Sequence, residues 1–274
     1  MFRLLLLLLL LTACTSLPTP EDRQSHAEAL ARHQHWSPVR LDGGRFSLLA
    51  YVPEYIRPAE HLSIYIEGDG LAWISASRAS TDPTPRNPLA LKLALAQPEG
   101  NAVYLARPCQ YQSSNETVDC PQRYWTEERF APEVIEASNR AVDQLKVRFG
   151  AERLTLVGYS GGAAVAALIA ARRADVERLI TVAGNLDHRA WTTRHRLAPL
   201  TGSLNPAADA IPALSRIAQW HFVGDQDRII PPELVQGFAE RFPAGKQPRV
   251  IEHGEFDHHC CWAEAWPGLW RSMQ

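Results

Sequence analysis

The stretch Gly158–Gly162, Gly-Tyr-Ser-Gly-Gly, places a serine among glycines at the junction of two apolar runs. The run before it, 153–159, has the composition of a buried strand, and the alanine-rich run after it, 161–173, that of a helix. Glycine permits the tight turn that such a junction needs, because it has no Cβ to collide with neighbouring backbone. Ser160 is therefore predicted to stand at the start of a helix as a nucleophile.

The main alternative for a glycine-rich turn between a strand and a helix is a phosphate-binding loop. That loop requires Gly-x-Gly-x-x-Gly, or a final Gly-Lys followed by Ser or Thr, and neither pattern follows this strand. A Gly-x-Ser-x-Gly pattern by itself is common at ordinary glycine and serine frequencies. Its position between a strand and a helix is what favours the nucleophile.

A serine hydroxyl is a weak nucleophile at neutral pH, so it needs a histidine base that a carboxylate orients. The segment 220–232, Trp-His-Phe-Val-Gly-Asp-Gln-Asp-Arg-Ile-Ile-Pro-Pro, ends a strand with Asp225 and Asp227. The later segment 250–262 carries three histidines near the last helix. The chain thus supplies serine, acid and base in that order.

These three segments resemble the α/β-hydrolase superfamily, and in particular its compact bacterial esterase-like members, over residues 45–271. In that superfamily the acid lies three residues after the glycine that closes its strand and shortly before a proline. The resemblance therefore implies that Asp227 is the acid, since it follows Gly224 and precedes Pro231. Asp225 is then a neighbouring loop residue.

For the base, the resemblance implies His258, which follows the sequence Glu-Phe-Asp at 255–257. His259 is the rival position, because successive residues of an extended segment point to opposite sides and only one imidazole can face the serine. His253 lies within the preceding strand, where a structural role is expected.

The resemblance also implies an oxyanion hole made of two backbone N–H groups, one from Gly161 and one from the Glu-Gly-Asp-Gly loop at 67–70, most simply Asp69. Glu67 stands where the family usually has a histidine, a change that leaves the backbone donors in place. An Asp69 carboxylate facing the developing oxyanion would oppose it, so this side chain is expected to point away or be paired. The alternative is that 67–70 is a plain glycine turn.

The elements that must position these residues alternate between strand and helix along the chain. Near-continuous apolar strands in such an order predict an α/β fold with a doubly wound, mostly parallel sheet and helices on both faces, the α/β-hydrolase fold. The polar span 185–212 is long for a connection and is expected to form a small cap or lid. Strands are expected at 45–53, 61–70, 101–108, 153–160, 177–185, 216–227 and 248–256, and helices at 87–97, 131–150, 161–173, 231–242 and 261–271.

The N-terminus has one arginine, eight consecutive leucines and then small residues, the layout of a secretory signal rather than a membrane-spanning helix. Leu11–Cys14 resembles the lipobox of bacterial lipoproteins, in which the chain is cut before the cysteine. Residues 1–13 are then a lipoprotein signal peptide, and Cys14 is a lipid anchor carrying acyl chains such as palmitate. Because Thr15 and not aspartate follows the cysteine, the resemblance implies the outer membrane of the cell envelope if the source is a Gram-negative bacterium. The alternative is an ordinary signal peptide.

After the signal, 14–44 are expected to form a lipid-anchored tether and leading helix, and 45–274 the α/β-hydrolase domain. Four other cysteines remain, and an even number in an oxidising compartment predicts disulfides with three possible pairings. Cys109 and Cys120, eleven positions apart in one polar segment, are the preferred pair. Cys260 and Cys261 either bridge to each other or stay reduced. In the same polar segment, Tyr111, Tyr124 and Trp125 either line the substrate pocket or pack a disulfide-pinned loop.

The formal net charge of −2 and the scattered basic residues argue against nucleic-acid binding. The favoured interpretation is a membrane-tethered serine hydrolase that cleaves small carboxylic esters through an acyl-enzyme, without cofactor or metal. Acyl group and alcohol stay open, as does the choice among ester, thioester and amide. One alternative is a metal site built from His253, His258, His259, Cys260 and Cys261, which leaves Ser160 without a role. Another is a non-catalytic lipoprotein that uses the fold as a binding scaffold.

Overall fold

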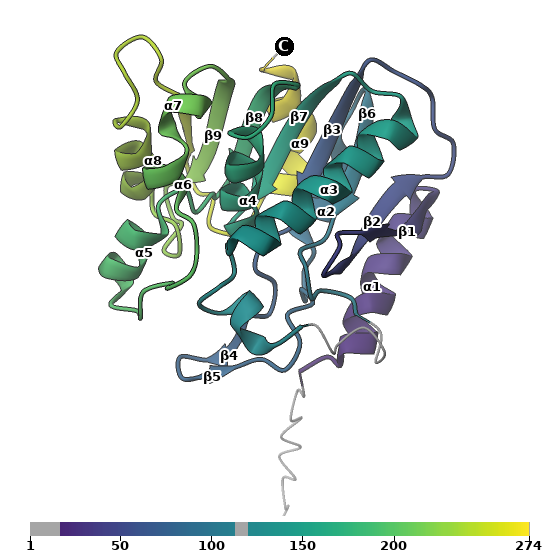
Figure 1. Ribbon diagram of the computed structural model, residues 1–274, viewed down its shortest axis with the longest axis horizontal. Helices are drawn as coiled ribbons and strands as arrows, with labels where there is room; N and C mark the ends of the chain where they lie inside the picture. The colour runs from purple at the N-terminus through teal and green to yellow at the C-terminus, as the bar shows by residue number, and fades with distance from the viewer. Residues whose placement is uncertain (1–16, 113–119, 274) are drawn as a thin grey trace, which may run out of the picture.

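The computed structural model describes residues 17–112 and 120–273 and contains an eight-stranded sheet in the order β1-β2-β6-β3-β7-β8-β9-β10 (Figure 1). The strands of this sheet are β1 (Trp36–Asp42), β2 (Ser47–Pro53), β3 (His61–Ile66), β6 (Asn101–Leu105), β7 (Arg153–Tyr159), β8 (Val176–Val182), β9 (Ala218–Gly224) and β10 (Arg249–His253). A separate hairpin pairs β4 (Trp73–Ser75) with β5 (Arg78–Ala79).

The six strands from β6 to β10 in this order run parallel, whereas β1 and β2 are antiparallel additions at one edge. Parallel strands need crossover connections, and helices supply them on both faces of the sheet. The predicted α/β-hydrolase fold with a mostly parallel sheet is confirmed.

The helices divide into two layers around the sheet. The helices that cover the sheet are α1 (Pro20–His33), α2 (Leu89–Ala96), α3 (Pro132–Phe149), α4 (Gly161–Ala170), α8 (Pro232–Ala239) and α9 (Trp262–Arg271). The core on one face contains the apolar sides of α3 and α4, and the core on the other face contains those of α1, α2 and α9. Figure 1 shows α3 and α4 in front of the sheet and α9 behind it.

Helix α4, which follows the serine, is buried on every side: all ten of its residues are buried. A helix that is apolar all round belongs in the core, and its alanines allow close approach to its neighbours. It packs against β7, β8, α3 and α6 (Pro206–Asp209). The start of α4 is thereby held rigidly at the carboxyl ends of the central strands.

The carboxyl ends of the parallel strands all open at one edge of the sheet, the lower edge in Figure 1. The hairpin β4–β5 lies along this edge, and so does α5 (His188–His195). The expected cap over 185–212 consists of α5, α6 and α7 (Ile211–Leu214), three short helices after β8. Ligands of open parallel sheets bind outside the carboxyl ends of the strands, so this edge is where a site is expected.

The expected leading helix exists as α1, but it is part of the core. Ala27 and Ala31 are fully buried, and the chain continues into β1, which pairs with β2 along its whole length. The sheet therefore begins at Trp36, earlier than the expected domain boundary between 44 and 45. The predicted signal peptide 1–13 and the anchor Cys14 lie outside the described residues. Within the described ranges, no helix combines the length and apolar character needed to cross a bilayer.

Two disulfides occur in the described chain. Cys109 is bonded to Cys120, the pairing expected from their spacing, and this bridge pins the loop that follows β6. Cys260 is bonded to Cys261, which is the first of the two alternatives that the sequence left open. The second bridge lies between the last histidines and the start of α9.

Candidate active site

Ser160 occupies a sharp turn between β7 and α4. Its backbone is in the left-handed region, with φ of 50° and ψ of −120°, which residues other than glycine rarely adopt. The turn depends on its glycines: a Cβ on Gly158 would lie 2.4 Å from the Ala163 Cα atom, and one on Gly162 would lie 2.3 Å from the Ile66 carbonyl oxygen. Such strained backbone persists where the surrounding structure holds it, and functional sites are where it gathers.

The three residues expected to act together are hydrogen-bonded in a chain. The Ser160 Oγ atom lies 3.0 Å from His258 Nε2, and His258 Nδ1 lies 2.8 Å from Asp227 Oδ2. The serine comes from the end of β7, the aspartate from the loop after β9 and the histidine from the loop after β10. This geometry lets the imidazole accept the hydroxyl proton while the carboxylate fixes the ring orientation.

Asp227 is held in place by the loop that follows it. Its Oδ1 atom accepts hydrogen bonds from the backbone N–H groups of Ile229 and Ile230, both at 2.8 Å. Its side chain is completely buried, whereas Asp225 is exposed. The structure therefore brings Asp227, and not Asp225, to His258.

His259 points to a different partner. Its Nδ1 atom lies 2.8 Å from the Tyr159 hydroxyl, which also lies 3.2 Å from the His258 carbonyl oxygen. Burial, together with the neighbouring His258, lowers the pKa of His259. Tyr159 precedes the serine, so this contact ties the histidine loop to the serine turn. His253 packs among aromatic rings, those of Phe222 and Trp262 included.

Two backbone N–H groups beside Ser160 are available to a ligand. Among the described residues, neither the Asp69 N–H nor the Gly161 N–H has a hydrogen-bond acceptor. The Gly161 N–H also lies at the start of α4, where the helix dipole favours negative charge. Both groups that the sequence proposed for an oxyanion hole are thus free to donate.

The Asp69 carboxylate next to them is paired, as expected. Arg107 Nη1 lies 3.2 Å from its Oδ1 atom, and Arg129 Nη1 lies 2.6 Å from its Oδ2 atom. Burial alone would raise the pKa of Asp69, but the charges of Arg129 and Arg107 hold it below its usual value. Two guanidinium groups and one carboxylate leave a net positive charge beside the serine, which favours a developing anion.

The sequence analysis did not identify these two arginines. Both belong to the segment after β6, where the candidate pocket residues predicted from sequence were aromatic. Tyr111, Tyr124 and Trp125 are buried in the core, so the packing alternative applies to them. The sequence signal that could have found them is Asp69, because a carboxylate expected beside an oxyanion hole needs a cationic partner.

Glu67 is a second buried acid beneath the same loop. Its Oε1 atom accepts a hydrogen bond from the Gly68 N–H at 2.8 Å, whereas its Oε2 atom has no partner among the described residues. Burial raises the pKa of Glu67 to about 7. Between pH 4.5 and pH 7, Glu67 is therefore mostly protonated in the folded protein but mostly ionised in the unfolded chain.

We expect Glu67→Gln to stabilise the protein at alkaline pH. Because the folded pKa is raised, the penalty for ionising Glu67 appears above pH 4.5 and is complete above pH 7. A neutral glutamine removes a cost of about 3 kcal/mol at pH 8, but only about 1 kcal/mol at pH 5. Urea unfolding at both pH values measures the change in the free energy of unfolding, and Glu252→Gln at an exposed position is the matched control. A Glu67→Gln effect that is equal at both pH values would contradict the buried-acid explanation.

A cavity of about 680 Å³ opens above Ser160 and His258. One wall is polar and includes Glu67, Asp69 and Arg129, the last of which is 5% exposed. The remaining wall is mostly apolar and comes from the segments that follow β3, β8 and β9, including β4 and α5. Its apolar members are Leu71, Ala72, Trp73, Trp191, Ile229 and Ile230. Trp191 belongs to α5, so the helical cap contributes to the cavity.

The alternative metal site is not assembled in the described part of the chain. No group of three or more histidine, cysteine or acidic side chains there is placed to hold a metal ion. The sulfur atoms of Cys260 and Cys261 are bonded to each other, so neither is a thiolate ligand. His258 instead lies between Ser160 and Asp227.

In a comparison with protein families, residues 91–260 match the family described as Serine hydrolase (FSH1). The matched range includes the serine turn, Asp227 and both C-terminal histidines. A comparison with curated proteins finds no match.

Many solved structures share the fold. An alpha-beta serine hydrolase homologue from Coxiella burnetii is 16% identical, with a TM-score of 0.59 over 87% of this chain and 97% of that chain. Est1E from Butyrivibrio proteoclasticus is 14% identical, with a TM-score of 0.59 over 86% and 97%. An esterase from Pyrococcus furiosus is 13% identical, with a TM-score of 0.54 over 87% of both chains. At these identities the likeness is one of fold.

Proposed function

The chain belongs to the FSH1 serine hydrolase family and is a hydrolase, and from this premise we propose that it cleaves carboxylic esters through a Ser160 acyl-enzyme. The observation that carries the proposal is the hydrogen-bonded chain from Ser160 through His258 to Asp227, at the floor of the cavity. Fold alone would not specify an activity, but these side chains have the geometry that serine nucleophiles need.

In the first step, the Ser160 Oγ atom attacks the ester carbonyl carbon while His258 Nε2 accepts the hydroxyl proton. The carbonyl oxygen becomes an oxyanion that the N–H groups of Asp69 and Gly161 stabilise. Collapse of this intermediate breaks the bond to the alcohol oxygen, and His258 returns the proton to the leaving alcohol. The acyl group then remains bonded to Ser160.

In the second step, a water molecule attacks the acyl-enzyme carbonyl carbon and gives its proton to His258. The second oxyanion uses the same N–H groups, and its collapse releases the carboxylic acid as the proton returns to Ser160 Oγ. Asp227 stays ionised throughout and stabilises the imidazolium that forms twice in each cycle. The Arg107 and Arg129 charges beside Asp69 offset the negative charge that would otherwise oppose the oxyanion.

Two observations support esters as the bond cleaved. The apolar wall of the cavity suits an acyl group, since pockets bind by burying apolar surface around a few polar groups. Two proteins of similar fold, Est1E from Butyrivibrio proteoclasticus and the Pyrococcus furiosus protein, carry esterase-type names. A series of p-nitrophenyl esters of increasing acyl length, beside a matching thioester and amide, tests this choice: faster turnover of the thioester or the amide would overturn it.

We also propose that the enzyme is a lipoprotein of the outer membrane, attached through Cys14. We expect mature protein purified from membranes to begin at Cys14 and to carry acyl chains there, because Leu11–Cys14 resembles a lipobox. Intact-protein mass spectrometry measures this modification directly. Cys14→Ser should remove the modification and leave the precursor uncut at this position. An unmodified N-terminus in wild-type protein from the soluble fraction would contradict the anchor.

A further inference from the structure

We propose that the edge carrying the candidate active site docks on an anionic phospholipid surface, so that the cavity opens toward the bilayer and takes esters from it. This docking surface consists of Leu17, the β4–β5 hairpin, Arg86, 196–197 and 228–229. This proposal rests on the proposed ester hydrolysis and, for its third observation, on the proposed Cys14 anchor; the first two observations come from the described surface.

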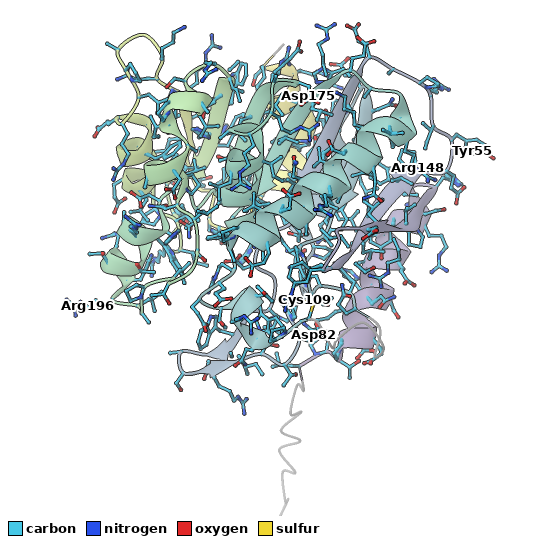
Figure 2. All side chains as sticks on the ribbon, in the orientation of Figure 1. Tyr55, Asp82, Cys109, Arg148, Asp175 and Arg196 are labelled. Atoms are coloured by element: carbon cyan, nitrogen blue, oxygen red, sulfur yellow. A yellow bond between two sulfur atoms is a disulfide. The ribbon has the colours of Figure 1, made fainter. Side chains whose placement is uncertain are left out.

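The first observation is where exposed apolar side chains gather. Large apolar side chains with substantial exposure in the described chain are Leu17, Tyr55, Trp73, Val147, Leu197 and Ile229. Four of these six belong to the docking surface, each 43–45% exposed. Figure 2 shows Tyr55 and Arg148, the neighbour of Val147, in the upper half, and Arg196, the neighbour of Leu197, in the lower half. Two of them, Trp73 and Ile229, line the cavity, and exposed apolar groups gathered at one edge of a molecule mark an interaction surface.

The second observation is charge. Arg78, Arg86, Arg196 and Arg228 are exposed and have no ion pair with any residue that the structure describes. Three carboxylates of the neighbouring loops are in ion pairs, Asp82 with Arg23, Glu128 with Arg123 and Glu233 with Arg194. Asp225 and Asp257, beside Arg228, are exposed without an ion pair to a described residue, so the four arginines outnumber these two carboxylates. Arginines without an ion pair, placed among exposed apolar groups, are the combination that anionic headgroups attract.

The third observation is where the N-terminal chain enters. Pro18 lines the cavity that contains Ser160, and α1 begins two residues later. Pro18 lies four positions after Cys14, and four residue steps of fully extended chain span at most about 14 Å. A lipid attached at Cys14 therefore keeps the cavity mouth within about 14 Å of the membrane surface. The opposite edge of the sheet is too far from the anchor to face the bilayer instead.

Trp73 and Ile229 connect the docking surface with the chemistry. Both are exposed at the rim, and both also line the cavity. Tryptophan has an apolar ring with a polar N–H group, which suits the boundary between headgroups and acyl chains. An ester in the bilayer would thus pass along a continuous apolar path from the membrane to Ser160, which a water-soluble ester does not need.

The experiment uses the full-length lipidated protein reconstituted into vesicles of phosphatidylcholine and phosphatidylglycerol. The variant Leu197→Gln/Arg78→Glu changes the docking surface outside the cavity, and Tyr55→Gln/Arg148→Glu is the matched control on the opposite edge. We expect the first variant to hydrolyse a long-chain fluorogenic ester dissolved in the bilayer about tenfold more slowly. Both variants should hydrolyse p-nitrophenyl butyrate in water within about twofold of the wild-type rate.

Hydrogen exchange on the same vesicles reports the orientation without relying on activity. Docking predicts that peptides covering 71–79 and 226–230 gain protection on vesicles and that the Leu197→Gln/Arg78→Glu variant loses it. Equal exchange with and without vesicles, or equal rates for the two variants on the bilayer ester, would overturn docking. If the wild type hydrolysed no ester, the proposed function would fail, while exchange would still decide docking. If Cys14 carried no lipid, docking would be tested by flotation of added protein with the same vesicles: protein that floats with them supports docking, and protein that stays behind overturns it.

Discussion

We expect Ser160→Ala to abolish ester hydrolysis while leaving the fold intact. Among the residues that the structure describes, only this hydroxyl is hydrogen-bonded to His258 Nε2, so its loss removes the attacking atom and leaves the base without its proton donor. Loss of the nucleophile should lower kcat by about 10⁴-fold or more, the remaining rate coming from the oxyanion hole and substrate binding. Steady-state kinetics with a p-nitrophenyl ester, together with fluorophosphonate labelling, measures both the rate and the identity of the nucleophile.

The control for this experiment is stability. Alanine keeps the Cβ atom, but it removes a hydroxyl in a turn that is already in the left-handed region, so circular dichroism and thermal unfolding should accompany the kinetics. Full-strength labelling of Ser160→Ala would show that another residue is the nucleophile. Wild-type protein that neither labels nor turns over any ester would favour the binding-scaffold alternative.

The parts of the molecule that were predictable from sequence are those set by local rules. The serine turn needed glycines between a strand and a helix, and α3 carried Pro132 at its start and Gly150, in the left-handed conformation, at its end. The acid and the histidine each follow a predicted strand of the parallel sheet. Because parallel strands end at the same edge of the sheet, both residues were predicted to lie at the edge that carries Ser160. The resemblance to a known superfamily chose between Asp225 and Asp227, and the structure buries only Asp227.

What could not be predicted depends on partners that are distant in sequence. Strand β1 contains Pro38 and alternates poorly, so it has no local strand signal; it forms because β2 offers an unpaired edge. The ion pairs of Asp69 join residues 38 and 60 positions apart. The Tyr159–His259 contact spans 100 positions. A local stretch of sequence therefore never includes both members of one of these pairs, and local patterns cannot predict the contact.

The choice between the adjacent histidines yields the second large effect: we expect His258→Ala to lower kcat by about 10³-fold or more, and His259→Ala to lower it by about tenfold or less. Only the His258 ring lies between the Ser160 hydroxyl and the Asp227 carboxylate, and a base acts as a unit with the nucleophile it activates. The His259 ring binds the Tyr159 hydroxyl, so its loss loosens the loop without removing the base. The measurement is kcat for both variants on one p-nitrophenyl ester.

A third variant, Tyr159→Phe, separates the positioning role of His259 from a direct one. It removes the hydroxyl that contacts His259 Nδ1 and the His258 carbonyl oxygen, but it keeps both imidazoles and the aromatic ring beside His258. If His259 only positions the loop, Tyr159→Phe and His259→Ala should lower kcat to a similar extent, and the double variant should add little, because both break one contact. The reverse ranking of the two histidines would assign the base to His259, and near-normal rates in both would exclude this set of residues from the chemistry.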